Sequence, residues 1–296
     1  MKALAVLMCI GLLAVATHGM GHIPTPFGMM PETCVHRVRS GATIREVEGG
    51  VHVAHPEGDV HLPTRPECVA WLKERMAATE ARLSQSSQPA GSDVPTETFP
   101  PSNGWLDYVG YYPSQLVHYF SGRYTVPQTP KNMGGLLYWF IGSENFQTGI
   151  GVTILQPVLT YYTNGWTFSS WNCCPQGQAH QSTPISGFGP GDVLDGVIDQ
   201  SGDNWVVYSS FGRQSTQLTV PDAGRKFNWV DVTLETYDVT DCAQFASGPV
   251  SFYDMKLVLS DGSSVPPVWQ LNSPASTKCN GTLTVNSPFS VTIRHN

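Results

Sequence analysis

Charged side chains are scarce in this sequence: Asp, Glu, Lys and Arg together make up 13% of its 296 residues, and the formal net charge is −7. A chain with few cations and a negative balance lacks the basic face that nucleic-acid binding requires. Beyond the N-terminus, no apolar run is long enough to span a bilayer as a permanent anchor. We therefore expect neither nucleic acid nor a membrane anchor among its partners.

Several familiar catalytic signatures are also missing. The sequence contains no serine elbow, no HExxH, no P-loop and no dinucleotide-binding fingerprint. Its cysteines form no CxxC pair, so a structural zinc site ranks well below disulfides. Asp192, Asp195 and Asp199 lack the carboxylate-rich loop that a calcium site needs. We therefore expect neither a cofactor nor a metal ion.

The first 16 residues have the pattern of a secretory signal peptide. Lys2 supplies a positive start, an apolar run follows from Ala3 to Val15, and small residues end it at Ala16. A sequon at Asn280 predicts N-glycosylation and suits the same compartment. The sequence thus predicts a secreted, extracellular protein.

Removal of that leader also removes Cys9 and leaves an even number of cysteines, which in an exported chain favours disulfides. Sequence neighbourhood predicts the bonds Cys34–Cys68 and Cys242–Cys279. The adjacent Cys173 and Cys174 then either bond to each other, which is rare, or reach other partners.

The N-terminal third divides into a small segment, residues 17–83, and a linker, residues 84–104. Within the segment, a hairpin is predicted around Pro56, and Pro66 opens the one convincing helix. The linker is rich in Ser, Gln and Pro and cannot bury a core. The small segment could be a propeptide, an inhibitory cap or an accessory module.

Residues 105–296 are predicted to form one all-β domain. Short strand-like runs recur with Gly, Pro, Asn and Asp turns between them and without helices, which predicts a two-sheet antiparallel β-sandwich of the concanavalin or jelly-roll kind. The expected strands are Gly122–Val126, Leu136–Gly142, Val152–Tyr162, Trp166–Trp171, Val193–Ile198, Trp205–Phe211, Gln217–Val220, Val230–Val239, Val250–Leu259 and Thr282–Ile293.

Two polar residues stand out within these strands. Gln156 is an uncharged amide in the apolar run Thr153 to Thr160, and such a group is costly to bury without partners. Glu235 places a carboxylate in a second run, Val230 to Tyr237. If these strands are neighbours, an amide and a carboxylate face one cleft. Taken singly, each residue is more often structural.

The ordered motifs around these residues resemble the glutamic peptidases (eqolisins) over about residues 120–253. The resemblance begins with Thr125-Val126-Pro127, passes through Trp139 and Gly142 to Ile154-Leu155-Gln156, and then includes Leu234-Glu235 and the stretch from Phe245 to Phe252. It implies a peptidase in which Glu235 is the general base and Gln156 donates to the oxyanion, acting on a protein or peptide at acidic pH. One departure is Thr160, near which the family usually has an aspartate.

Aromatic residues around the expected cleft leave another function open. We expect Trp139, Trp166 and Trp171 to contact substrate, although aromatics more often fill sandwich interiors. They also suit a non-catalytic, lectin-like sandwich that binds carbohydrate, and a structural extracellular or wall protein could keep only the scaffold. His180 is expected to be a solvated loop residue.

Overall fold

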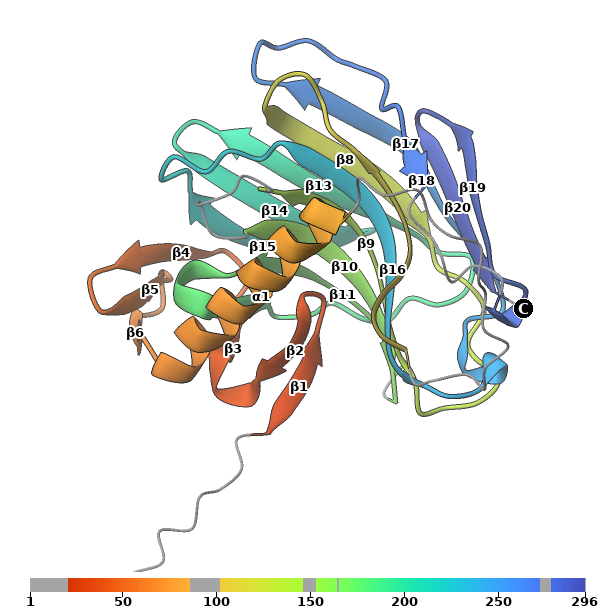
Figure 1. The fold of residues 1–296 in the computed structure, drawn as a ribbon, viewed down its shortest axis with the longest axis horizontal. Helices are drawn as coiled ribbons and strands as arrows, with labels where there is room; N and C mark the ends of the chain where they lie inside the picture. The colour runs from red at the N-terminus through yellow and green to blue at the C-terminus, as the bar shows by residue number, and fades with distance from the viewer. Residues whose placement is uncertain (1–20, 86–101, 146–152, 164, 272–277, 296) are drawn as a thin grey trace, which may run out of the picture.

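A computed structural model describes residues 21–85, 102–145, 153–163, 165–271 and 278–295, and it is built mainly from two large β-sheets packed face to face (Figure 1). The predicted all-β sandwich class is confirmed. The predicted leader, residues 1–16, and most of the predicted linker lie outside the described residues. No helix within the described ranges is both long and apolar enough to cross a membrane.

The first sheet has eight strands and carries the candidate site. In spatial order these strands are β18 (Gln270–Leu271), β7 (Ser102–Tyr111), β16 (Trp229–Val239), β9 (Leu136–Glu144), β10 (Ile154–Tyr162), β11 (Gly165–Cys173), β12 (Ala179–Ser182) and β3 (Val35–Val38). All neighbouring pairs are antiparallel except β12 with β3, which is parallel.

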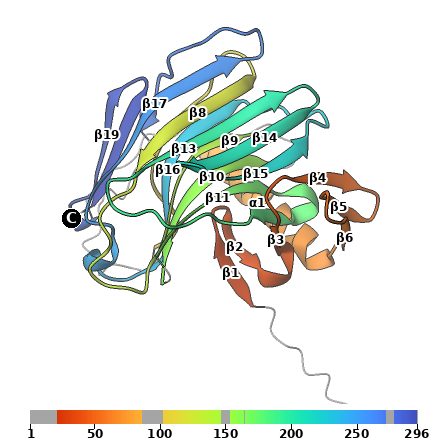
Figure 2. The same ribbon diagram turned by 180° about the vertical axis from the view of Figure 1, so that it is seen from behind.

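The second sheet has ten strands; it lies behind the first in the view of Figure 1 and faces the viewer in Figure 2. In spatial order they are β19 (Thr282–Ser287), β20 (Ser290–His295), β17 (Gly248–Leu259), β8 (Val117–Thr125), β13 (Val193–Ser201), β14 (Asn204–Phe211), β15 (Gln214–Pro221), β4 (Ala42–Val47), β5 (Gly50–Ala54) and β6 (Val60–Pro63). The run expected as one strand, Thr282–Ile293, is the hairpin β19–β20.

A hydrophobic core fills the space between the sheets and is anchored by Tyr124. Its ring packs edge-on against Phe168 and Phe252. Its hydroxyl donates to the Pro157 carbonyl at 3.0 Å and accepts from the Ile141 N–H at 3.2 Å. Burying one such aromatic side chain contributes about 2–3 kcal/mol, and here its polar end also joins the two sheets because both of its partners lie on the opposite sheet.

The N-terminal segment covers the outer face of the first sheet. It contains the hairpin of β1 (His22–Thr25) and β2 (Gly28–Pro31), the short helix η1 (Glu32–Cys34) and the helix α1 (Pro66–Gln85). The hairpin and α1 lie over this face (Figures 1 and 2). We call the β1–β2 hairpin and α1 the cover, and the sheet surface beneath them the covered face. All nine residues of β9 are buried, as expected for a strand enclosed on both sides.

The same segment also continues both sheets. β3 pairs with β12 through the register His36 to His180, and β4 pairs with β15 through Ala42 to Leu218. The predicted hairpin around Pro56 is formed by β5 and β6. Backbone hydrogen bonds therefore hold the N-terminal segment to the sandwich in addition to the side-chain contacts of the cover.

Three disulfides are present in the described residues, and both predicted pairs are confirmed. Cys34–Cys68 ties η1 to the first turn of α1. The other predicted bond joins η3 (Cys242–Gln244) to η4 (Lys278–Asn280). In the chain-entropy account, closing loops of this length stabilises the fold by about 3–4 kcal/mol each. Cys173 and Cys174 are bonded to each other immediately before the short helix η2 (Pro175–Gly177).

Candidate active site

Strand alternation places Gln156 and Glu235 on the same side of the first sheet. Glu235 lies opposite Tyr138 on β9, and Tyr138 lies opposite Thr160 on β10. Thr160 and Gln156 are four residues apart in one strand, so their side chains share a face. Both predicted site residues are therefore on the covered face, and both are fully buried.

The strand register brings Gln156 next to a different carboxylate. Leu155 pairs with Ser143 and Val158 with Phe140, which sets Gln156 opposite Gly142. Gly142 pairs in turn with Asp231 on β16. Asp231, Gly142 and Gln156 thus form one row across three adjacent strands.

Glu235 lies farther along the sheet. Its row contains Tyr138, four residues from Gly142 on β9. At roughly 3.3 Å per residue, the rows of Glu235 and Gln156 are about 13 Å apart along the strands. The structure thus puts the predicted pair on one face without bringing the two residues into one row. Sequence reasoning missed Asp231, although its spacing of four from Glu235 was a usable sign that the two share a face.

The Gln156 side chain contacts the cover. Its Nε2 donates to the backbone carbonyl of Pro26, at the turn of the β1–β2 hairpin, at 3.4 Å. Its Oε1 has no hydrogen-bond partner within the described residues. A buried amide whose carbonyl oxygen has no partner is energetically costly and marks a site worth explaining.

Glu235 is paired with an aromatic hydroxyl. The Tyr237 hydroxyl donates to its Oε1, while Oε2 has no partner in the described part of the chain. Burial raises the pKa of Glu235 to about 8, and the hydrogen bond from Tyr237 and the guanidinium of Arg75 oppose that rise. With the cover in place this carboxyl is therefore neutral in acid.

Asp231 and Glu144 form a second acidic group beside Gln156. The Thr233 hydroxyl donates to Asp231 Oδ2, and Asp231 Oδ1 has no partner among the described residues. Burial raises the pKa of Asp231 to about 8. It raises that of Glu144 well above the ordinary value, and the charge of Asp231 adds to the shift. Like charges this close in a dry site do not both ionise readily.

Contacts from the cover fill the space above this face. The Tyr138 hydroxyl donates to the Pro24 carbonyl at 3.2 Å, and Phe27 packs edge-on against Trp171 with ring centroids 5.8 Å apart. From α1, the Trp71 indole N–H donates to the Met29 carbonyl at 2.8 Å. A peptide cannot reach Gln156 until these contacts are displaced.

The three tryptophans predicted to contact substrate are not in equivalent places. Trp171 pairs with Gln156 across β10 and β11 and lies on the covered face. Trp139 and Trp166 point the other way, into the core between the sheets, and their rings contact each other. Strand alternation is the reason. Trp139 and Trp166 occupy positions whose side chains alternate with those of the covered face and therefore point to the opposite side of the sheet. The structure therefore corrects their expected position.

His180 is likewise not the solvated loop residue expected from sequence. It lies in β12, is fully buried and stacks with His36 of β3. Burial, with the nearby charge of His36, lowers the pKa of His180 to about 3. The parallel contact between β3 and β12 therefore stacks the fully buried His180 ring on the half-buried His36 ring where the N-terminal segment joins the first sheet.

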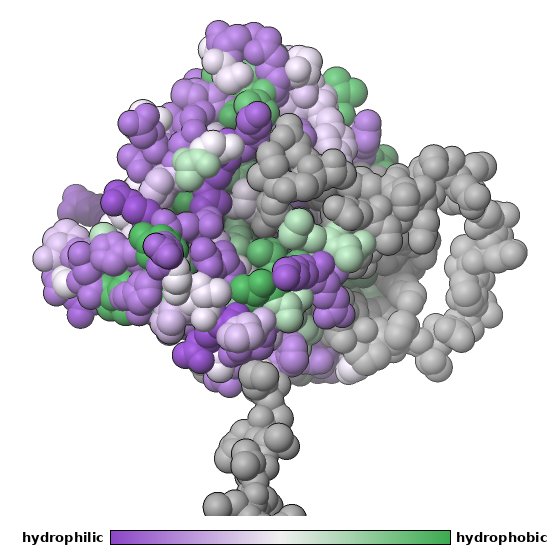
Figure 3. Space-filling model, turned by 60° about the vertical axis from the view of Figure 1, so that its left-hand side comes forward, coloured by the Kyte–Doolittle hydropathy of each residue, from purple (hydrophilic) through white to green (hydrophobic). Residues whose placement is uncertain are grey.

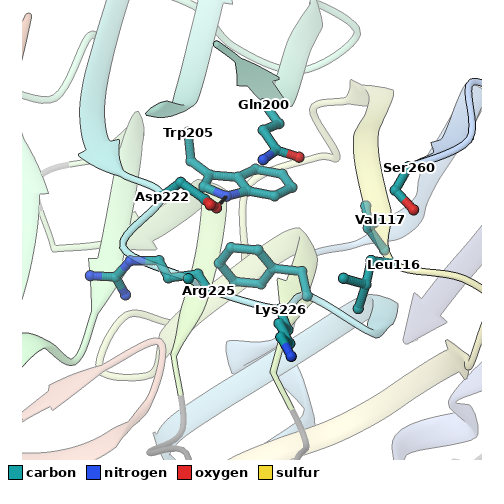
Figure 4. Close-up of a pocket in the computed structure, with 10 residues that line it drawn as sticks. Leu116, Val117, Gln200, Trp205, Asp222, Arg225, Lys226 and Ser260 are labelled. Atoms are coloured by element: carbon teal, nitrogen blue, oxygen red, sulfur yellow. Dashed lines mark hydrogen bonds between the residues drawn. The ribbon is translucent and has the colours of Figure 1, made fainter. Parts of the chain in front are cut away.

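Outside the covered face, the described residues form a surface depression but no metal cluster. Within the described ranges, no three His, Cys, Asp or Glu side chains are grouped to hold a metal ion. A depression of about 230 Å³ lies away from the covered face (Figure 4). There the Trp205 indole N–H donates to Asp222 at 2.8 Å, and Lys226 lies nearby. Its carboxylate, Asp222, and its amide, Gln200, are both already hydrogen-bonded, Asp222 to Trp205 and Gln200 to His118. The side of the molecule in Figure 3 is largely hydrophilic, with small hydrophobic areas.

Comparison with known proteins gives matches in structure but none in sequence families. Solved glutamic peptidases are among its structural neighbours. Scytalido-glutamic peptidase with a transition state analog inhibitor aligns over 67% of this chain and 100% of its own, with 17% identity and a TM-score of 0.48. SCP-B, a member of the eqolisin family in complex with the tripeptide Ala-Ile-His, aligns over the same shares with 16% identity and a TM-score of 0.47.

An agglutinin is also among the structural matches. The homodimeric agglutinin CG-16 from chicken liver covers 51% of this chain and 98% of its own, with 10% identity and a TM-score of 0.30. No family model matches the sequence, and no curated protein matches it.

Proposed function

We propose that this chain is a secreted peptidase that hydrolyses peptide bonds at the covered face. Gln156 donates its amide N–H to the developing oxyanion, and a carboxylate of β16 acts as general base on the attacking water. The observation that carries the proposal is the buried contact from Gln156 to the Pro26 carbonyl. In it the amide already donates to the backbone oxygen of a peptide segment that lies on this face.

The chemistry suits these groups. A fixed N–H donor is worth most where negative charge develops in a water-poor site, and loss of one such donor commonly costs about 10²–10³ in rate. A carboxylate within reach of a water can take its proton as the water attacks. The sequence motifs single out Glu235 as that base, and Trp171, beside Gln156, offers an aromatic surface for a substrate side chain.

The cover also determines the conditions for activity. While it is in place, burial keeps the pKa values of Asp231 and Glu235 near 8, so both are protonated in acid and neither acts as a base. Displacement of the cover would let water reach them, and their pKa values would fall toward the ordinary range for carboxyl groups. We therefore propose a latent form that becomes active in acid after the cover leaves, and that residues 17–83 act as a propeptide.

Extracellular processing is part of the proposal. The leader of residues 1–16, the sequon at Asn280, which is exposed, and the three disulfides suit a secreted glycoprotein. Carbohydrate binding has less support, because Trp139 and Trp166 belong to the core between the sheets and cannot form a sugar platform.

The proposal is tested by incubating the protein with a denatured globular protein at pH 3–8. We expect new peptide N-termini, identified by mass spectrometry, with faster release after a protease site engineered into residues 86–101 has been cut. The matched uncut protein, kept under the same conditions, is the control. If no bond is cleaved at any pH, before or after cutting, the protein is not a peptidase.

A further inference from the structure

We infer that Asp231, and not Glu235, is the carboxyl that acts together with Gln156, and that Glu144 is its proton-sharing partner. This inference rests on the proposed peptidase function and assigns one role within it. It follows from the strand register rather than from the sequence motifs, which lead to Glu235.

The row of Asp231, Gly142 and Gln156 is wide enough to hold a water molecule and a carbonyl group between its two end residues. Its ends lie on β16 and β10, with β9 between them, so their backbones are about 10 Å apart at a strand spacing of roughly 4.8 Å. Side chains that lean inward from both ends leave room for a water and a carbonyl group between them. Glu235, about 13 Å away along the strands, does not share this space.

Gly142 provides the opening in the middle of the row. A Cβ built on Gly142 would collide with Asp231 Oδ1, so the carboxyl leans over β9 toward the strand of Gln156. A side chain at this position would occupy the same space. Glycine therefore keeps open the gap in which Asp231 and Gln156 approach each other.

The unused polar atoms of this row point to a ligand. Asp231 Oδ2 is held by the Thr233 hydroxyl, which leaves Oδ1 over Gly142 without a partner within the described residues. Across the gap, fully buried Gln156 Oε1 is also unpartnered there. Buried polar atoms of this kind normally have partners. A substrate peptide and a water would supply them.

Glu144 belongs to the adjacent row on the same face. It pairs with Trp229 on one side and Ile154 on the other, two residues from Gly142, and its side chain is buried. Its Oε1 has no partner in the described part of the chain. The charge of Asp231 contributes to the raised pKa of Glu144, and two carboxyls in neighbouring rows of one buried face titrate as a coupled pair.

The reaction balances with these groups alone. Asp231 carboxylate removes a proton from water as the water oxygen bonds to the scissile carbonyl carbon, and the C=O π pair moves to the oxygen that accepts from Gln156 Nε2. As the C–N bond breaks, the carboxylic acid returns that proton to the leaving nitrogen. The products are one acid and one amine, and Asp231 is again ionised. Glu235, two rows away, contacts a more distant part of the peptide.

The inference is tested in the protein cut at the site engineered into residues 86–101, with an internally quenched peptide chosen from the products of the cleavage experiment. We expect Asp231→Asn to lower kcat by about 10³-fold with little change in KM, whereas Glu235→Gln should raise KM and lower kcat by about tenfold at most. Gly142→Ala should lower kcat because it displaces Asp231. Asp203→Asn, at an exposed site, is the control.

The shared proton is tested without any turnover, by ¹³C-carboxyl NMR titration of the full chain. We expect Asp231→Asn to lower the titration midpoint of Glu144 more than Glu235→Gln does, because Asp231 contributes more than Glu235 to the raised pKa of Glu144. The inference is overturned if Glu235→Gln abolishes kcat while Asp231→Asn does not, or if Glu144 titrates independently of Asp231. If the parent protein cleaves no peptide at all, the proposed function fails, and the catalytic assignment fails with it.

Discussion

Phe27→Ala should raise the rate of peptide cleavage by the intact chain by about 10²-fold. Phe27 is buried beneath the β1–β2 hairpin and packs edge-on against Trp171. Truncating a buried Phe typically costs about 3–5 kcal/mol. In this chain the truncation weakens the packing of the cover against the covered face. About 1.4 kcal/mol corresponds to a factor of ten in an equilibrium constant. Even part of this lost packing energy would therefore greatly increase the fraction of molecules in which the cover is displaced.

A matched variant separates opening from general destabilisation. Phe188 is also buried, but it packs against Phe211 in the core between the sheets, away from the cover. Phe188→Ala should lower the melting temperature without raising the cleavage rate. If Phe27→Ala leaves the initial rate of the intact chain unchanged, the hairpin does not control access to Gln156.

Stability should fall as pH rises from about 4 to about 8, because the covered face buries carboxyl groups. Burial raises the pKa of Asp231 from 3.8 to about 8 and that of Glu235 from 4.5 to about 8, against the opposing charge of Arg75 on Glu235. The folded chain therefore keeps protons in this window that the unfolded chain releases. Their contribution to the free energy of unfolding is present below pH 4 and lost by pH 8, and it is on the order of several kcal/mol.

Thermal unfolding measured across this range checks the expectation. Asp231→Asn should flatten the decline between pH 4 and pH 8, and the exposed control Asp203→Asn should not. His180 works in the opposite direction, because burial lowers its pKa to about 3 and its contribution is lost as pH falls below about 6.5. His180→Gln should therefore reduce the loss of stability in acid. An unchanged pH slope in Asp231→Asn would mean that this carboxyl is ionised in the folded chain.

Local patterns were sufficient to predict most of the architecture. Alternating residues identified strands such as β13, where Leu194 and Ile198 are buried between less buried neighbours. Pro66 marked the start of α1, and sequence neighbourhood identified Cys34–Cys68. An amide in an apolar strand led to Gln156. Each of these signals acts within one segment, or between segments close in sequence.

Long-range register could not be obtained in the same way. Alternation assigns Asp231 and Glu235 to one face but does not say which of them lies level with Gln156, because that depends on how β16 pairs with β9. The faces of Trp139 and Trp166 were ambiguous for a related reason: strands that are buried on both sides show little alternation. The parallel pairing of β3 with β12 and of β4 with β15 likewise depends on contacts between segments that are distant in sequence.

The turnover number of Gln156→Ala, measured beside Gln178→Ala, tests the central claim most directly. Both glutamines are fully buried and both donate to a proline carbonyl, Gln156 to Pro26 and Gln178 to Pro63. Only Gln156 lies in the row with Asp231. We predict that Gln156→Ala loses about 10²–10³ in kcat, while Gln178→Ala loses only stability. Full retention of kcat by folded Gln156→Ala would contradict peptide hydrolysis at the covered face.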